Sequence, residues 1–239
     1  MKKILLIIIV LVYSNTFSQA TYTSADDGNW SSASSWTPSG TADSDSDGIP
    51  DSNDDVIINH SITVLSSQAA NTVDNNFVSG KILTLSGNSG LLTVTSNFIN
   101  DGGAVQITGG NAANPATLTV NGNLTQEGEF TIEAGQRLVM GGSSTITAKN
   151  PISINSSSDS YGSLYLYSTF SQGSSGGKVS YRRFVAGTAT WDLISVPISN
   201  LSINTFAQGE DDLATQNADY AIGEYSNTTA SYNAGAGSG

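Results

Sequence analysis

The chain contains no cysteine and a single histidine, His60. Without cysteine there can be no disulfide framework, no lipid-modified cysteine and no cysteine nucleophile. His60 lies in the strand-like segment "VIINHSITV", where an isolated imidazole is more often structural than the base of a Ser/His/Asp triad. We therefore do not expect nucleophilic catalysis.

Positive charge is also scarce. The sequence has 8 Lys+Arg against 20 Asp+Glu, a formal net charge of -12. Its basic pairs are Lys2-Lys3 and Arg182-Arg183. Binding DNA or RNA requires a basic surface that replaces phosphate counterions, so nucleic acid is excluded as a partner. An acidic surface instead favours solubility and divalent cations.

The apolar run that follows Lys2-Lys3, from Ile4 to Tyr13, is too short to cross about 30 Å of hydrocarbon as a helix. Small residues at Ser18 and Ala20 fit a signal peptidase site after Ala20. Residues 1–20 are therefore predicted to be a signal peptide, with a retained anchor as the alternative. We expect a mature chain without a membrane span, secreted or held at the cell surface in association with the outer membrane.

Beyond the signal segment, short runs rich in β-branched and aromatic residues alternate with Gly, Asn and Asp, and no run sustains a helical period. The composition predicts an all-β protein. The expected strands are Lys81–Leu85, Leu91–Thr95, Ala104–Ile107, Thr117–Val120, Phe130–Ile132, Arg137–Met140, Thr145–Thr147 and Ser163–Tyr167.

One internal repeat aligns without gaps. "LLTVTSNFINDG" from Leu91 matches "TLTVNGNLTQEG" from Thr117, an offset of 26 residues. An offset of this size is one coil of a solenoid, so we predict a right-handed parallel β-helix over residues 62–170. Asn97 and Asn123, which align in the repeat, are expected at a coil corner. A β-sandwich built from hairpins is the alternative fold.

The segments on either side of the repeats do not follow the repeat pattern. Residues 21–61 are predicted to form an N-terminal cap, with Trp30 and Trp36 as a buried plug. After "SQGSSGG", residues 171–239 are predicted to start a second β module with strands at Lys178–Val185 and Trp191–Val196. This module ends at "NAGAGSG" without a closing element, so we expect it to be incomplete.

The acidic stretch "DSDSDGIPDSND" within the cap has the spacing of a calcium loop. Positions 1, 3, 5, 9 and 12 of such a loop are carboxylates, position 6 is a glycine and position 7 contributes its backbone carbonyl. Gly48 occupies position 6, and position 12 has Asp where an EF-hand has Glu, which leaves selectivity over magnesium open. The predicted ligands are Asp43, Asp45, Asp47, Ile49, Asp51 and Asp54.

Without a cation these carboxylates repel one another, each close pair at a cost of about 1 kcal/mol. The alternative interpretation is a solvated acidic linker between the tryptophans and the first strand. No helix is expected to flank the stretch, because Pro38 precedes it and the strand-like "DDVIINHSITV" follows. We therefore expect an isolated calcium loop, not an EF-hand pair.

Two resemblances accompany this pattern. "DSDSDGIPDSND" is similar to one aspartate-rich calcium repeat of the thrombospondin type 3 class, here without the cysteines of animal members. The opening "GNWSSASSW", the Leu-Thr-Val coils and "YRRFVAGTATWDLISVPIS" together resemble large secreted surface proteins of the Bacteroidetes. Those proteins often end in a type IX secretion sorting domain. That route is implied here only if a C-terminal part follows.

Three function classes remain. A calcium-binding surface adhesion or structural protein, in contact with glycans or extracellular matrix, is the main hypothesis. The alternative is a carbohydrate-binding or polysaccharide-processing module, for which Tyr161, Tyr165 and Tyr167 are the one aromatic cluster. An enzyme is not expected. A glycosidase would need a carboxylate pair such as Glu127 and Glu129, and a calcium-dependent polysaccharide lyase would need a base such as Arg137 or Lys149.

Overall fold

The computed structural model describes residues 19–40, 43, 45–76, 78, 80–167, 169–173, 177–182 and 184, together with four short strands after residue 214. The chain divides into two units, Met1–Val185 and Ala186–Gly239. Residues 1–18 of the predicted signal peptide lie outside the described residues, as does the predicted strand Trp191–Val196.

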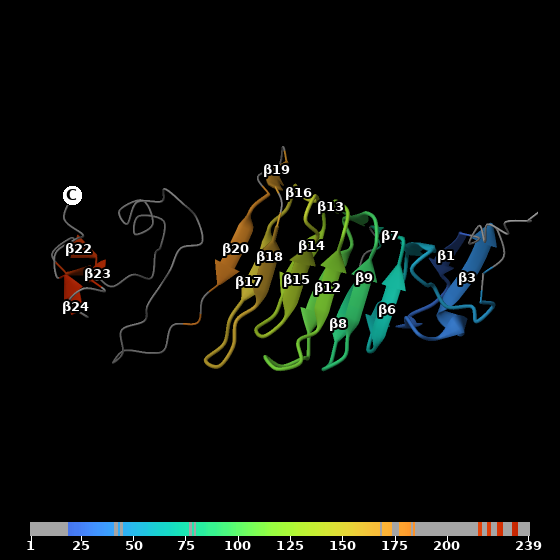
Figure 1. Cartoon of the computed structure of the whole chain (residues 1–239), viewed down its shortest axis with the longest axis horizontal. Coiled ribbons are helices and arrows are strands. Elements are labelled where there is room, and N and C mark those ends of the chain that lie inside the picture. The colour runs from blue at the N-terminus through green and yellow to red at the C-terminus, as the bar shows by residue number, and fades with distance from the viewer. Residues whose placement is uncertain are drawn as a thin grey trace, which may run out of the picture. The chain divides into compact units, whose positions relative to one another are not determined.

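The first unit is a β-solenoid, as predicted, and the β-sandwich alternative is wrong. From β4 to β17, successive strands visit three sheets in turn, and each pairs in parallel with the strand three places later in the chain. Before them, β1 and β2 pair in parallel with β4 and β5, whereas β3 pairs antiparallel with β1. The strands consequently stack side by side along the solenoid (Figure 1). The first sheet has the order β19-β16-β13-β10-β7-β4-β1-β3, the second β2-β5-β8-β11-β14-β17-β20, and the third β18-β15-β12-β9-β6.

The strands are short because each spans one side of a coil. All strands predicted between residues 81 and 167 are present within one or two residues of their predicted ends. The bounds are β1 Ala20–Ser24, β2 Gly28–Asn29, β3 Trp36–Gly40, β4 Asp55–Ile58, β5 Ile62–Val64, β6 Ser67–Ala70, β7 Thr72–Asn76, β8 Ile82–Ser86, β9 Leu91–Val94, β10 Phe98–Asp101, β11 Ala104–Thr108, β12 Thr117–Val120, β13 Leu124–Gln126, β14 Glu129–Ile132, β15 Arg137–Met140, β16 Thr145–Ala148, β17 Ile152–Asn155, β18 Ser163–Leu166, β19 Thr169–Gln172 and β20 Val179–Arg182.

The aligned repeat is confirmed in register. Leu92 of β9 pairs with Leu118 of β12, and Phe98 of β10 pairs with Leu124 of β13. Alternate residues of each strand point inward, and these four side chains are fully buried. Burying a side chain of this size contributes about 1.5–3 kcal/mol. Stacked apolar residues therefore form one continuous core through the solenoid.

The coils extend beyond both predicted ends. β1 and β4 already pair in parallel, so the solenoid begins before Ile62 and the predicted cap is its first coil. At the other end, β20 pairs in parallel with β17, so the solenoid continues past Phe170 into the segment predicted to start a second module. Gly177 permits this because a Cβ there would lie 1.9 Å from the carbonyl oxygen of Ala148.

Two polar ladders run along the coils. At the predicted corner, the Asn97 side chain accepts the N–H of Asn123, whose side chain accepts the N–H of Thr145, both at 2.9 Å. The second ladder is inside. Asn75 donates to Asn100, which donates to Gln126, both at 2.8 Å. Asn97 and Asn123 lie at a coil corner as predicted, whereas the buried ladder was not predicted.

The second unit contains two antiparallel strand pairs among its described residues. β21 (Thr215–Gln216) pairs with β22 (Asp219–Tyr220), and β23 (Glu224–Ser226) pairs with β24 (Ser231–Asn233). In the part of the chain that the structure describes, no helix has the length and apolar character needed to span a membrane.

Candidate metal centre

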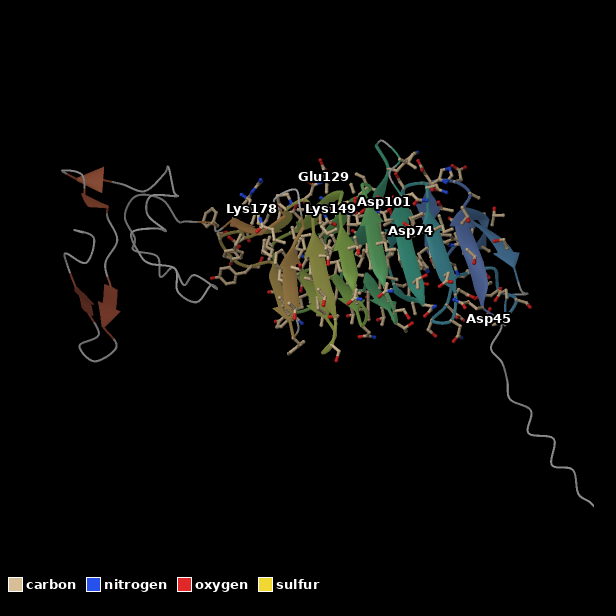
Figure 2. All side chains as sticks on the ribbon, turned by 90° about the horizontal axis from the view of Figure 1, so that it is seen from above. Asp45, Asp74, Asp101, Glu129, Lys149 and Lys178 are labelled. Carbon is tan, nitrogen blue, oxygen red and sulfur yellow. The ribbon has the colours of Figure 1, made fainter. Side chains whose placement is uncertain are left out.

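The aspartate-rich loop connects β3 to β4 at the N-terminal end of the solenoid, where Asp45 lies beside the first strands (Figure 2). Beneath it is the predicted tryptophan plug. Trp30 and Trp36 are buried and meet edge to face, with their ring centroids 5.1 Å apart. The indole N–H of Trp36 donates to the carbonyl of Trp30, and that of Trp30 donates to the carbonyl of Pro50. The plug is thus hydrogen-bonded to the loop itself.

Hydrogen bonds between alternate residues determine the loop conformation. Asp43 accepts the N–H of Asp45, Asp45 that of Asp47, and Asp47 that of Ile49, at 3.3, 3.3 and 2.7 Å. Each is an Asx turn, in which an aspartate side chain binds the backbone two residues later. Gly48 has a φ of 77°, the left-handed conformation that glycine adopts without strain. The sharp turn predicted at position 6 is therefore present.

These turns bring three of the predicted ligands together. Carboxylate oxygens of Asp43, Asp45 and Asp47 all lie within 4.8 Å of one another, and the described residues contain no other such group of three or more. Asp43 is half-buried, whereas Asp45 and Asp47 are exposed. One cation placed between these oxygens could contact all three residues.

The electrostatics of the cluster show how closely its groups interact. Burial opposes ionisation of Asp43, but hydrogen bonds from the Gly48 N–H and from other neighbours lower its pKa to about 2. The interaction with Asp43 raises the pKa of Asp45 above its ordinary value. The loop therefore holds charge at Asp43 while Asp45 is the first of the two to take up a proton. A divalent cation would relieve this repulsion.

Tyr22 of β1 lies directly below the cluster. Its side chain is fully buried. Burial, followed by the interaction with Asp43, raises the pKa of the Tyr22 phenol. The hydroxyl thus interacts with Asp43 of the metal loop, and this interaction helps to keep the Asp43 carboxylate charged. Sequence reasoning missed this residue, because only the strand register places Tyr22 under the loop.

Asp51 and Asp54 fall outside the group of three. Asp51 accepts the N–H of Asn53, and Asp54 is buried and accepts the N–H groups of Asp51 and Ala20 at 2.9 and 3.0 Å. Burial raises the pKa of Asp54. In this conformation Asp54 joins the loop to β1. The Ile49 side chain packs against the core. The predicted ligand atom of Ile49 is its backbone carbonyl, which this packing does not involve.

The remaining candidate residues have structural partners. The Nδ1–H of His60 donates to the carbonyl of Ser24 at 2.8 Å. Glu127 forms an ion pair with Lys149. Gly128 lies at a coil corner, between β13 and β14, so Glu127 does not share a strand with Glu129. These contacts support the structural interpretation of His60 and of the acidic pair.

The tyrosine cluster, by contrast, is exposed. Tyr161, Tyr165 and Tyr167 have 53, 42 and 69% of their surface accessible. The guanidinium carbon of Arg137 lies 6.0 Å from the ring centroid of Tyr165. The rings therefore do not form a buried seam, the structural role that the sequence also allowed.

No protein-family model, no curated protein and no solved structure matches this chain.

Proposed function

We propose that the protein is an exported structural or adhesion module whose N-terminal coil is ordered by one calcium ion. The observation that carries this proposal is the convergence of Asp43, Asp45 and Asp47 within 4.8 Å. Calcium takes six to eight oxygen ligands at about 2.3–2.6 Å, so three carboxylates, the Ile49 carbonyl and water can complete its shell. In this proposal Asp51, which lies outside the group of three, acts through such a water.

Ion binding would be coupled to the cap through contacts that already exist. Ile49 packs on the core, Pro50 accepts the indole N–H of Trp30, and Asp54 accepts the N–H of Ala20. Repulsion among the carboxylates strains this loop when no cation is bound. Calcium would replace that repulsion with coordination and hold the loop on the tryptophan plug.

The proposed adhesion role follows from export together with the solenoid. A stack of coils offers long, regular outer faces on which a partner can lie. The net charge of -12 keeps such a protein soluble and favours calcium over anionic partners. Glycans or extracellular matrix at the cell surface are the partners we propose.

Calorimetric titration and thermal melting test the calcium site. We expect one ion per chain, with a Kd of about 10⁻⁴ to 10⁻³ M as in extracellular modules. At about 10 mM calcium, mass action then stabilises the fold by roughly 1.4–2.7 kcal/mol. Replacing Asp45 and Asp47 together by Ala should remove the increment, and the matched control Asp26→Ala should retain it. Identical melts of the wild-type protein in calcium and in chelator would restore the solvated-linker interpretation.

A second candidate function is glycan binding at the exposed tyrosines. Tyr165 lies in β18 and Tyr167 directly follows that strand, both rings are exposed, and Arg137 borders Tyr165. Aromatic faces stack on sugar rings, and a neighbouring guanidinium favours an acidic sugar. Binding to a glycan array that is lost in Tyr165→Ala but kept in Asp45→Ala would support this function independently of calcium.

A further inference from the structure

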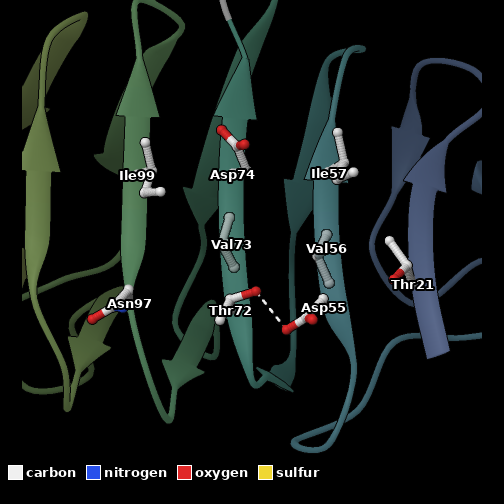
Figure 3. A pocket seen from close by; sticks show the side chains of 9 residues that line it. All are labelled: Thr21, Asp55, Val56, Ile57, Thr72, Val73, Asp74, Asn97 and Ile99. Carbon is white, nitrogen blue, oxygen red and sulfur yellow. Dashed lines mark hydrogen bonds between the residues drawn. The ribbon is translucent and has the colours of Figure 1, made fainter. Parts of the chain in front are cut away.

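A shallow hollow of about 360 Å³ lies on the outer face of the first sheet, and its lining residue Asp55 directly follows Asp54, the last residue of the aspartate-rich loop. Figure 3 shows its floor, formed by four neighbouring strands, β1, β4, β7 and β10. Its lining residues are Thr21, Asp55, Val56, Ile57, Thr72, Val73, Asp74, Asn97 and Ile99. Two carboxylates and no cation are among them.

Asp74 is placed between two isoleucines. Strand register pairs it with Ile57 on one side and with Ile99 on the other. Neighbouring strands lie about 4.8 Å apart, so the two apolar side chains flank the carboxylate directly. The same outward row continues with Thr125 on β13 and Thr147 on β16, which are small and polar. The pair of isoleucines is therefore a local feature of this hollow.

The Asp74 carboxylate lacks hydrogen-bond donors of the kind that the neighbouring Asp55 carboxylate has. Asp55 accepts hydrogen bonds from Asn71 and Thr72 at 3.0 and 2.5 Å. Oδ1 of Asp74 is buried and has no hydrogen-bond partner among the described residues. Burial, with a smaller contribution from Asp101, raises the pKa of Asp74. An unsatisfied buried acceptor is costly, so Asp74 has a capacity that the fold itself does not use.

Among the residues that the structure describes, no cation supplies the missing partner. Lys81 pairs with Asp27, and Lys149 pairs with Glu127. We propose that the hollow binds a lysine side chain of another protein, with its aliphatic stem between Ile57 and Ile99 and its ammonium on Asp74. A lysine suits this place because it combines a compact point charge with an apolar stem.

Other ligands fit less well. Calcium requires several oxygens, whereas two isoleucines flank Asp74 and the Asp55 carboxylate is already hydrogen-bonded. A sugar ring would gain most from aromatic walls, and no aromatic residue lines the hollow.

The test is a titration of the purified chain, with labelled isoleucine methyl groups followed by NMR. The probe is a lysine blocked at both termini, and the reference is the equally blocked norleucine, which lacks the ammonium. We expect saturable shifts confined to Ile57 and Ile99, with at least tenfold weaker binding of norleucine. Asp74→Asn should weaken lysine binding about tenfold, the value of one charge-assisted hydrogen bond, and Asp159→Asn should leave it unchanged.

Three results would overturn the proposal. Equal binding of lysine and norleucine would show a merely apolar contact. Displacement of the lysine probe by millimolar calcium in the Asp45→Ala, Asp47→Ala variant would identify the hollow as a metal site. An absence of shifts at Ile57 and Ile99 at saturating probe would show that the hollow binds no ammonium. None of these results depends on whether the calcium loop functions as proposed.

Discussion

Replacing Asn100 by Ala tests the importance of the buried ladder. Asn100 is fully buried and joins its coil to both neighbours. It accepts from Asn75 at 2.8 Å, and it donates to the Oε1 atom of Gln126 at 2.8 Å and to the carbonyl of Glu129 at 3.2 Å. The substitution leaves the Gln126 oxygen and the Glu129 carbonyl without this donor, inside the coil where water does not replace it.

The magnitude follows from these two orphaned acceptors. Each buried polar group that loses its partner costs about 1–3 kcal/mol. Asn75 keeps its hydrogen bond to the carbonyl of Ala104, so its amide group is not left without a partner and adds little to the loss of stability. We therefore expect Asn100→Ala to lower the free energy of unfolding by about 2–5 kcal/mol.

Urea unfolding followed by far-UV circular dichroism measures the loss, and Asn123→Ala is the matched control. Asn123 occupies the exposed corner ladder, where its side chain accepts the N–H of Thr145 at 2.9 Å. Water can replace it there, so we expect a loss of about 1 kcal/mol or less. A loss for Asn100→Ala no greater than that for Asn123→Ala would refute the argument that burial of the ladder matters.

Three further predictions concern other residues. Burial, together with the nearby charge of Asp101, raises the pKa of Asp74 in the folded state. The ionised carboxylate therefore destabilises the fold above that pKa, and this destabilisation disappears as the pH falls and Asp74 takes up a proton. The urea unfolding midpoint of Asp74→Asn should therefore be higher than that of the wild-type protein at pH 7 and equal to it near pH 3. The sequence predicts cleavage after Ala20, but Ala20 is buried in β1 and its N–H binds Asp54, so we revise the prediction to a mature chain that still includes Ala20. N-terminal sequencing of the exported protein that begins at Thr21 would contradict this revision. Gly128→Ala should cost about 3 kcal/mol in the same urea assay, because its Cβ would lie 1.9 Å from a backbone oxygen, and an unchanged midpoint would contradict this.

The repeat carried most of the fold prediction. Leu92 and Leu118 align in the sequence because they stack in the structure, and a pattern that repeats coil by coil reveals its own register. Short strands such as β13 were not predicted, since Leu124–Gln126 presents only one polar residue between two inward ones. A glutamine considered without its neighbours is expected to be exposed to solvent, so the inward position of Gln126 was not predicted either. Its role depends on Asn100 in the adjacent coil.

The candidate site was predictable to a similar degree. The spacing of Asp43, Asp45 and Asp47 follows from local chain geometry, so the sequence alone placed these carboxylates together. The burial of Asp54 depends on the backbone of Ala20, and the position of Tyr22 depends on strand register. Long-range contacts of this kind leave no spacing signal. The hollow around Asp74 was missed for the same reason, because Ile57 and Ile99 meet it only across strands.

A crystal structure of the chain grown in about 10 mM calcium, with anomalous diffraction to identify the ion, tests the central claim most directly. The account predicts one calcium ion in the loop, with carboxylate oxygens of Asp43, Asp45 and Asp47 at about 2.3–2.6 Å from it. It also predicts that the Ile49 carbonyl and water complete the shell and that the Pro50 carbonyl keeps its hydrogen bond from Trp30. A loop without an ion at this concentration, or an ion that contacts none of these three aspartates, would contradict the account.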